Sequence, residues 1–111
     1  LLEQGRTERA TEYSSAQRCR AQLRATVDDD LSGLDALLTP TIATVAKRWD
    51  APDLDDWSIA RFLPAFNLTG HPAISLPVPS ERLPVGIQVV GHRGQDHALL
   101  ATARWIEQHS P

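Results

Sequence analysis

Two apolar stretches rich in glycine and proline constrain the fold most strongly: NLTGHPAISLP at residues 67–77 and LPVGIQVVG at residues 83–91. Both are apolar at most positions, whereas a strand with one face in water alternates apolar and polar residues. We therefore expect strands at 73–78 and 85–90 that are covered on both faces. The connection between them is too short for a parallel crossover, so they should pair as an antiparallel hairpin.

The rest of the chain adds helices and one more strand. Apolar residues at intervals of three or four predict an amphipathic helix at 7–31, and a similar pattern predicts a final helix at 96–109. The run LDALLTPTI predicts an inner strand at 34–39, and Pro64 limits a short helix at 56–66. This order of elements predicts an α/β layer arrangement.

The length of the chain, 111 residues, is that of one domain, so we expect residues 1–111 to form a single unit. Strands covered on both faces need more cover than two long helices provide, and open sheet faces and edges would remain. The sequence also contains no methionine, at position 1 or elsewhere. We therefore expect that the chain either has lost its initiator or begins within a longer protein, of whose sheet it is a slice.

Charge and cysteine content exclude several classes of protein. A net charge of -3 and a pI near 5.7 argue against nucleic-acid binding, and Arg18, Arg20 and Arg24 are interpreted as a solvated helix face. No apolar stretch is long enough to cross a membrane, and the first residues lack the order of a signal peptide. Cys19 is the only cysteine and can form no internal disulfide, so we expect a cytoplasmic protein.

Four stretches of the chain, in this order, resemble the C-terminal portion of the amidase signature enzymes. They are EYSSAQRCRAQL, LDALLTPTIA, NLTGHPAISLPV and LPVGIQVVGHRGQDHALLATARWIE, and the resemblance extends over residues 5–107. It implies a C-terminal fragment of a three-layer α/β/α fold with a mixed sheet. It also implies an amidase that cleaves linear carboxamide C–N bonds to a carboxylate and ammonia or an amine. Such enzymes use a nucleophilic serine, a second serine with a cis peptide bond, and a lysine, and no cofactor is expected.

The catalytic groups of that family are expected to lie outside this chain. The nucleophile loop needs adjacent glycines beside paired serines, whereas the six glycines here are never adjacent. The serine pair Ser14 and Ser15 falls in the first predicted helix, where its hydroxyls would be solvated. Lys47, the only lysine, lies in an acid-rich loop that would keep it charged, so we interpret it as a surface charge. The chain alone should therefore be inactive.

The remaining chemically active side chains predict no site. His71, His92, His97 and His109 lack the spacing and the sulfur ligands of a specific metal site, so they are interpreted as loop and surface histidines and no metal is expected. Cys19 falls on the apolar stripe of the first predicted helix, where a buried thiol is inert. We therefore interpret Cys19 as a packing residue rather than as the nucleophile of a small stand-alone hydrolase.

The expected contribution to a binding site is part of the wall of a substrate pocket. In the enzymes that the chain resembles, the region before the turn lines the acyl side of the pocket, and here it contains Trp57, Arg61, Phe62 and Phe66. Trp57 and Phe62 suit an apolar or aryl group but fit a hydrophobic core equally well, and Phe66 is assigned to the core. In the glutamine-using branch of the family, the tRNA-dependent amidotransferases, an acidic residue stands at the position of Ala60, which favours a general amidase.

The turn that follows is interpreted as a structural feature. Asn67, Gly70 and Pro72 match an Asn-x-x-Gly-x-Pro turn that introduces a strand in the family. The amide of Asn67 can bond to local backbone groups, and Gly70 can adopt a positive φ.

The sequence therefore predicts part of an amidase that acts on a small-molecule amide together with a missing N-terminal amidase segment or a partner chain. Two alternatives remain open. One is a non-catalytic remnant or split subunit that docks on another polypeptide through its open sheet edge. The other is the amidase-like subunit of a tRNA-dependent amidotransferase.

Overall fold

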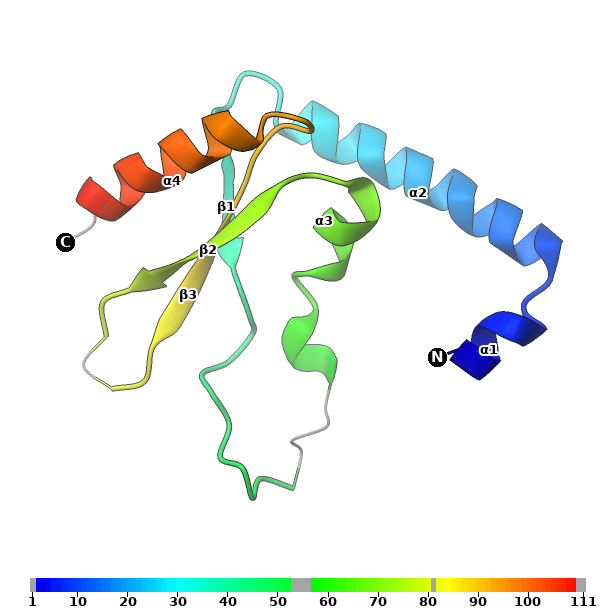
Figure 1. The fold of residues 1–111 in the computed structure, drawn as a ribbon, viewed down its shortest axis with the longest axis horizontal. Coiled ribbons are helices and arrows are strands. Elements are labelled where there is room, and N and C mark those ends of the chain that lie inside the picture. The colour runs from blue at the N-terminus through cyan, green and yellow to red at the C-terminus, as the bar shows by residue number, and fades with distance from the viewer. Residues whose placement is uncertain (1, 53–56, 81, 110–111) are drawn as a thin grey trace.

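The computed structural model describes residues 2–52, 57–80 and 82–109. Helices and strands follow one another in an α/β order (Figure 1). The elements are α1 (Leu2–Thr7), α2 (Ala10–Asp30), β1 (Leu37–Pro40), the 3-10 helix η1 (Trp57–Ala60), α3 (Pro64–Thr69), β2 (Ala73–Val78), β3 (Val85–Val90) and α4 (Asp96–His109). In this described part of the chain, no helix is both long enough and apolar enough to cross a bilayer.

The strands form a small sheet in the order β1-β3-β2, and both pairs are antiparallel. β2 and β3 form the expected hairpin at the expected residues. The strand expected at 34–39 begins only at Leu37, because Leu37 pairs with Val90, the last residue of β3, and the residues before it have no strand beside them. Within these strands β1 lies at an edge, not inside the sheet as the sequence predicts.

One face of the sheet packs against α4, which contacts β2 and β3. Leu76 of β2 and Val89 of β3 are buried there with Leu99 and Ala103 of α4. Gly91 allows the helix to come close, since a Cβ on Gly91 would lie 3.0 Å from the Cβ of Leu99. This contact forms one of the two hydrophobic clusters of the described chain.

The opposite face is covered only at one end. Phe66 of α3 packs there with Val90 and with Val27 and Leu31 of α2. Farther along this face the side chains of β2 are exposed, and the burial of β2 alternates from residue to residue. The expectation of strands covered on both faces therefore holds for the end of β3, where three successive residues are buried, and fails for β2.

The first predicted helix, at 7–31, corresponds to α2 at Ala10–Asp30, and the separate short helix α1 precedes it. Arg9 is extended, with φ -78° and ψ 147°, and its backbone N–H donates to the Glu12 carboxylate at 2.9 Å. Since an extended residue stops one helix and caps the next, α1 ends at Thr7 and α2 begins at Ala10.

The apolar stripe of α2 is buried only in its second half. Val27 and Leu31 reach the core, whereas Tyr13 is 65% exposed and Cys19 is exposed. The first half of α2 leads away from the sheet in Figure 1. The interpretation of Cys19 as a packing residue is therefore wrong, because Cys19 is exposed.

The short helix expected at 56–66 is divided in two, and Pro64 begins a helix instead of limiting one. Proline suits the first position of a helix because its missing N–H needs no partner there and its fixed φ is already helical. α3 therefore extends from Pro64 to Thr69, after the separate helix η1. Gly70 ends it with φ +77°, and the Gly70 N–H donates to the Phe66 carbonyl at 2.9 Å.

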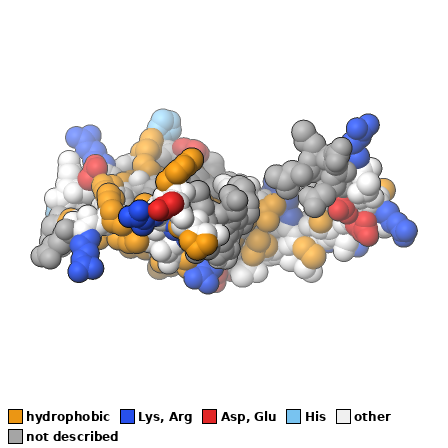
Figure 2. All heavy atoms as spheres, turned by 90° about the horizontal axis from the view of Figure 1, so that it is seen from below, with side chains coloured by type: hydrophobic (Ala, Val, Ile, Leu, Met, Phe, Trp, Pro, Cys, Tyr) orange, Lys and Arg blue, Asp and Glu red, His pale blue; other side chains and the backbone are white. Residues whose placement is uncertain are grey.

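The molecule is thin and open for its length. Its radius of gyration is 16.8 Å and its extents are 50 × 43 × 18 Å, whereas a compact domain of this length has a radius near ~13 Å. Figure 2 shows hydrophobic side chains at the surface among charged ones. Trp49 and Trp105 are among the large apolar residues that remain exposed. Much of the apolar surface of the fold is thus left in contact with solvent.

Candidate functional site

A row of polar side chains lies on the sheet face opposite α4. Thr39 and Ser75 flank Gln88 in register, and Thr41 follows β1 beside them. We call Thr39, Thr41, Ser75 and Gln88 the polar row. Because successive residues of a strand point to opposite faces, these residues alternate with the ones that pack on α4. The row is thus set by strand register.

Hydrogen bonds tie the polar row together. The hydroxyls of Thr41 and Ser75 lie 2.6 Å apart. The side-chain amide of Gln88 donates to the Thr39 hydroxyl at 3.0 Å and to the Phe62 carbonyl at 3.3 Å. Gln88 is buried, so these bonds compensate an amide that would otherwise be costly to remove from water. Thr41 and Ser75, by contrast, keep hydroxyls that can both donate and accept.

Gly86 leaves the space in which the two hydroxyls meet. A Cβ on Gly86 would lie 2.8 Å from the Ser75 hydroxyl oxygen and 2.9 Å from that of Thr41. The Thr41 backbone N–H donates to the Gly86 carbonyl at 3.0 Å, which holds the segment after β1 against β3. An open hollow of about 330 Å³ lies next to Gly86, between residues 42–45 and 84–85.

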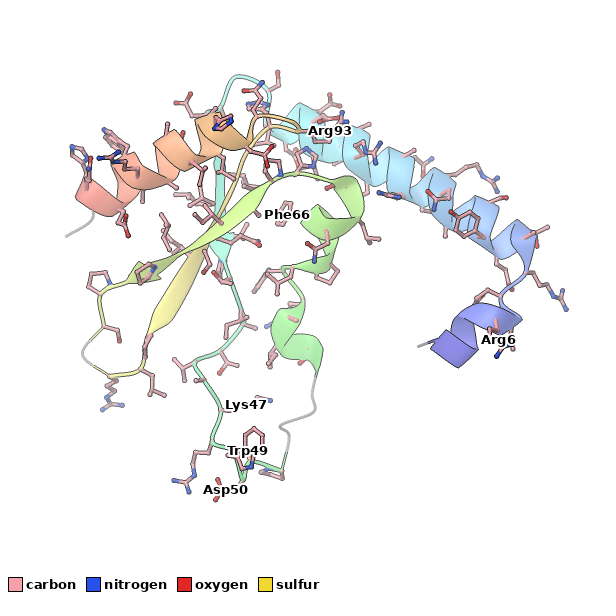
Figure 3. The ribbon with its side chains drawn as sticks, viewed as in Figure 1. Arg6, Lys47, Trp49, Asp50, Phe66 and Arg93 are labelled. Atoms are coloured by element: carbon pink, nitrogen blue, oxygen red, sulfur yellow. The ribbon has the colours of Figure 1, made fainter. Side chains whose placement is uncertain are left out.

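Of the residues predicted to line a pocket, the structure brings Arg61 and Phe62 together and places Phe66 in the core. Arg61 is exposed and its guanidinium lies 5.4 Å from the centre of the Phe62 ring. Phe62 is half-buried, and its carbonyl accepts the bond from Gln88 at the polar row. Phe66 is buried in the core against Val90, as the sequence predicts, and Figure 3 labels it at the junction of α3 and the sheet. The side chain of Trp57 lies outside the described residues.

The turn residues stand at the junction of α3 and β2. Asn67 is exposed within α3 and not ahead of a turn, since α3 continues to Thr69. Gly70 has the expected positive φ. The Pro72 carbonyl accepts a hydrogen bond from the Gly91 N–H at 2.9 Å, which extends the pairing of β2 and β3 by one step. The turn thereby fixes where β2 begins.

His71 lies in a buried network that the sequence does not predict. Its side chain is fully buried, with Nδ1 2.8 Å from the Thr69 hydroxyl and Nε2 3.2 Å from the Asp28 carboxylate. Arg93 donates two bonds to the same carboxylate, at 2.7 and 3.0 Å. The interpretation of His71 as a surface histidine is therefore wrong. Asp28 is 43 residues from His71 and 65 from Arg93 in the sequence, so no local pattern signals the network.

Thr69, His71 and Asp28 are residue types that form catalytic triads, but a substrate has no access to this network. Thr69 is fully buried and its hydroxyl also donates to the Ala65 carbonyl at 2.9 Å, so a substrate cannot reach it. The hydrogen bonds from Arg93 chiefly hold the pKa of Asp28 below its usual value, and Asp28 in turn raises the pKa of Arg93. The network joins α2, the turn after α3 and the segment before α4, which is a structural role.

The other candidate groups form no site in the described chain. Ser14 and Ser15 are exposed on α2. Lys47 is half-buried in the loop after β1, near the ion pair of Arg48 and Asp50 at 2.9 Å, and Figure 3 shows this loop projecting away from the sheet. Across residues 2–52, 57–80 and 82–109, no three histidine, cysteine, aspartate or glutamate residues are grouped so that they could hold a metal ion.

Comparisons with a family model and with individual proteins indicate the same family. The family model described as Amidase matches residues 1–100. The A subunit of the glutamyl-tRNA(Gln) amidotransferase of Thermotoga maritima is 38% identical over 102 residues, which are 89% of this chain and 22% of that protein. The corresponding protein of Pseudothermotoga lettingae is 37% identical over the same shares of the two chains.

Solved structures agree with the sequence comparison. The crystal structure of the Thermotoga maritima protein matches 91% of this chain with a TM-score of 0.79 at 38% identity, and the match covers 23% of that chain. A crystal structure of an amidase matches 99% of this chain with a TM-score of 0.87 at 29% identity, and the match covers 27% of that chain. The expected fold class, an α/β fragment of the amidase signature fold, is thus confirmed.

The chain spans about a quarter of the length of these solved relatives. The match over residues 1–100 extends through the polar row, the turn and the start of α4. This chain belongs to the amidase family.

Proposed function

We propose that this chain is the C-terminal segment of an amide-hydrolysing enzyme and that it supplies part of the sheet and one wall of the substrate pocket. The observation that supports this proposal is the polar row on the face opposite α4, where the hydroxyls of Thr41 and Ser75 meet over Gly86. A sheet face that presents hydroxyls suits the recognition of a small polar ligand, because pockets combine apolar walls with a few placed hydrogen-bonding groups.

The chemistry is divided between this chain and the rest of the enzyme. In this proposal the nucleophilic serine, its partner serine and the lysine come from an upstream segment, since the serine pair of this chain lies on an exposed helix. Thr41 and Ser75 can donate to a substrate carbonyl or accept from its amide N–H. Phe62 supports the row through its carbonyl and gives the wall an apolar ring next to the cation of Arg61.

The open sheet indicates where the upstream segment would bind. β1 and β2 each have one neighbour among the described strands, so each has an edge that is free to pair. An unpaired edge is a ready template for another strand. A segment that covers these edges and the exposed face of β2 would also lower the large exposed apolar surface of the fold.

The test is a chimera in which this chain replaces the matching quarter of the Thermotoga maritima relative. Ammonia release from simple aryl and aliphatic amides would be measured, with the parent relative as positive control and the 111-residue chain alone as negative control. We expect the chimera to hydrolyse amides and the chain alone to release no ammonia. A folded chimera without activity on any amide would contradict the proposal.

A second candidate is the A subunit of a glutamyl-tRNA(Gln) amidotransferase. The observation in its favour is the 37–38% identity to proteins of that name. Against it stands Ala60, which is half-buried in η1 at the position where the resemblance places an acidic residue. The same chimera distinguishes the two: preferential hydrolysis of glutamine would support the amidotransferase, and preferential hydrolysis of simple amides would support a general amidase.

A further inference from the structure

Two arginines of α2 bind the end of α3. The Nε–H of Arg20 donates to the Leu68 carbonyl, and the Nε–H of Arg24 donates to the Thr69 carbonyl at 3.0 Å. The arginines are four residues apart and therefore lie on one face of α2. Their interpretation as part of a solvated helix face is wrong for these two residues, which are half-buried, although Arg18 is exposed.

The carbonyls that the two arginines bind have no partner within α3. The last four carbonyls of a helix lack the N–H groups of a following turn and must be satisfied by other donors. Leu68 and Thr69 are the last two residues of α3, and Gly70 then turns the chain toward β2. The guanidinium groups thus take the place of a longer C-terminal cap, and their positive charge suits the C-terminal end of a helix.

Charged contacts at a protein surface usually contribute little to stability. The two arginine bonds matter because of the segments that they join. They join residues 48 and 45 positions apart. Asp28, one further turn along α2, binds the buried His71 that follows the same turn. Three successive turns of α2 therefore contact the segment from Leu68 to His71 at three points, which fixes both its position and its direction.

This segment stands between the two parts of the proposed pocket wall. Toward the C-terminus it leads into β2, which carries Ser75 of the polar row. Toward the N-terminus it continues into α3, and the Phe62 carbonyl that holds Gln88 lies just before the start of that helix. A shift at the end of α3 would therefore move both parts of the row.

We propose that Arg20 and Arg24 are positioning residues that set the pocket wall by holding the end of α3. They touch no substrate and act through the turn. The catalytic part of this inference, an effect on substrate binding, rests on the proposed function. The structural part, that the two arginines hold the end of α3, does not depend on it. The two parts are tested separately.

The structural part is tested by amide hydrogen exchange in the 111-residue chain. We compare the double variant Arg20→Gln/Arg24→Gln with Arg18→Gln, which removes an exposed arginine from the same helix. The Gly70 and His71 amides, which donate to the Phe66 carbonyl, should exchange faster by about tenfold in the double variant. Amides of β3 serve as the internal reference and should not change.

Equal exchange of the Gly70 and His71 amides in the double variant and in Arg18→Gln would overturn the inference. Faster exchange of β3 by the same factor would also overturn it, because it would show general loosening of the fold. If the double variant does not fold, the single variant Arg20→Gln replaces it. Arg20 belongs to neither hydrophobic cluster, so that change removes the contact with the Leu68 carbonyl without opening the core.

The catalytic part is tested in the chimera. A displaced wall should weaken substrate binding while the nucleophile is unaffected, so Arg20→Gln/Arg24→Gln should raise KM several-fold at nearly unchanged kcat. A KM equal to that of the parent chimera would refute the positioning role. An inactive parent chimera would refute the proposed function instead, and the exchange experiment would still decide whether the arginines hold the end of α3.

Discussion

The contact between Thr41 and Ser75 across Gly86 makes a sharp prediction for Gly86→Ala. The new methyl group would lie 2.8 Å from the Ser75 oxygen and 2.9 Å from the Thr41 oxygen, closer than side-chain atoms pack. The two closest atoms are hydroxyl oxygens, on the exposed Ser75 and the half-buried Thr41, and can rotate away, whereas the Thr41 Cβ at 3.3 Å requires a small shift of the segment after β1. The substitution should therefore break their hydrogen bond and leave the strands in place.

The size of the effect follows from two opposed terms. Loss of one such hydrogen bond lowers the unfolding free energy by about 0.5–1.5 kcal/mol. Alanine in place of glycine within a strand raises it by roughly 0.5–1 kcal/mol. The net loss of unfolding free energy for Gly86→Ala should stay below about 1 kcal/mol. In a background of Ser75→Ala the bond is already absent and the nearest oxygen is gone, so the same change should be neutral or stabilising.

The assay is a double-mutant cycle by urea denaturation, with far-UV circular dichroism and a fixed m-value. We expect a coupling free energy between Gly86→Ala and Ser75→Ala of about 1 kcal/mol. Gly5→Ala is the control, because a Cβ there meets no atom within 4 Å apart from its chain neighbours and the backbone of its own helix. Additivity within about 0.3 kcal/mol, or a loss above about 3 kcal/mol for Gly86→Ala alone, would refute the reasoning.

Three further predictions concern the core, the ion pair and the free thiol. Phe66→Ala should cost about 3 kcal/mol or more in unfolding free energy, because Phe66 is buried, and the half-buried Phe62→Ala clearly less; equal losses in urea would contradict this order. The pKa of Asp28 is lowered chiefly by the bonds from Arg93, so the stability they give is present above the ordinary pKa of 3.8. It should be lost as the pH falls through the folded pKa, and Asp28→Asn should remove that acid-side dependence; an unchanged pH profile of Tm would contradict it. Cys19 is exposed, so it should react with a thiol reagent in the native chain and Cys19→Ala should shift stability by less than about 0.5 kcal/mol; a protected thiol would contradict its exposure.

Local patterns in the sequence are sufficient for the elements whose neighbours are close in the chain. The ranges 73–78, 85–90 and 96–109 coincide with β2, β3 and α4. A short connection determines the hairpin, and an aspartate at the helix start with apolar residues at helical spacing determines α4. For these segments the residues that decide the structure lie within or beside the segment.

The predictions differ from the structure where contacts between distant parts of the chain determine the local structure. β1 begins at Leu37 because β3 ends at Val90, and the residues around Leu37 carry no sign of that limit. The stripe of α2 predicts burial along the whole helix, but only the half that meets α3 and the sheet is buried. Pro64 is ambiguous by itself, since proline both ends and begins helices.

The candidate site is only partly predictable for the same reason. The resemblance to amidases indicates the region around Phe62, and the assignment of Phe66 to the core is confirmed. The polar row depends on the register of three strands, and the network of Asp28, His71 and Arg93 depends on contacts over 43 and 65 residues. The sequence around each residue of the row and of the network gives no sign of these contacts. Only the fold brings the residues together.

In the proposed function this chain supplies a pocket wall and sheet edges but no nucleophile. The most direct test measures ammonia release from an aryl amide by the 111-residue chain, first alone and then mixed with a separately purified upstream segment of an amidase. We expect no release above a heat-treated control for the chain alone and turnover in the mixture. Turnover by the purified chain alone would contradict it.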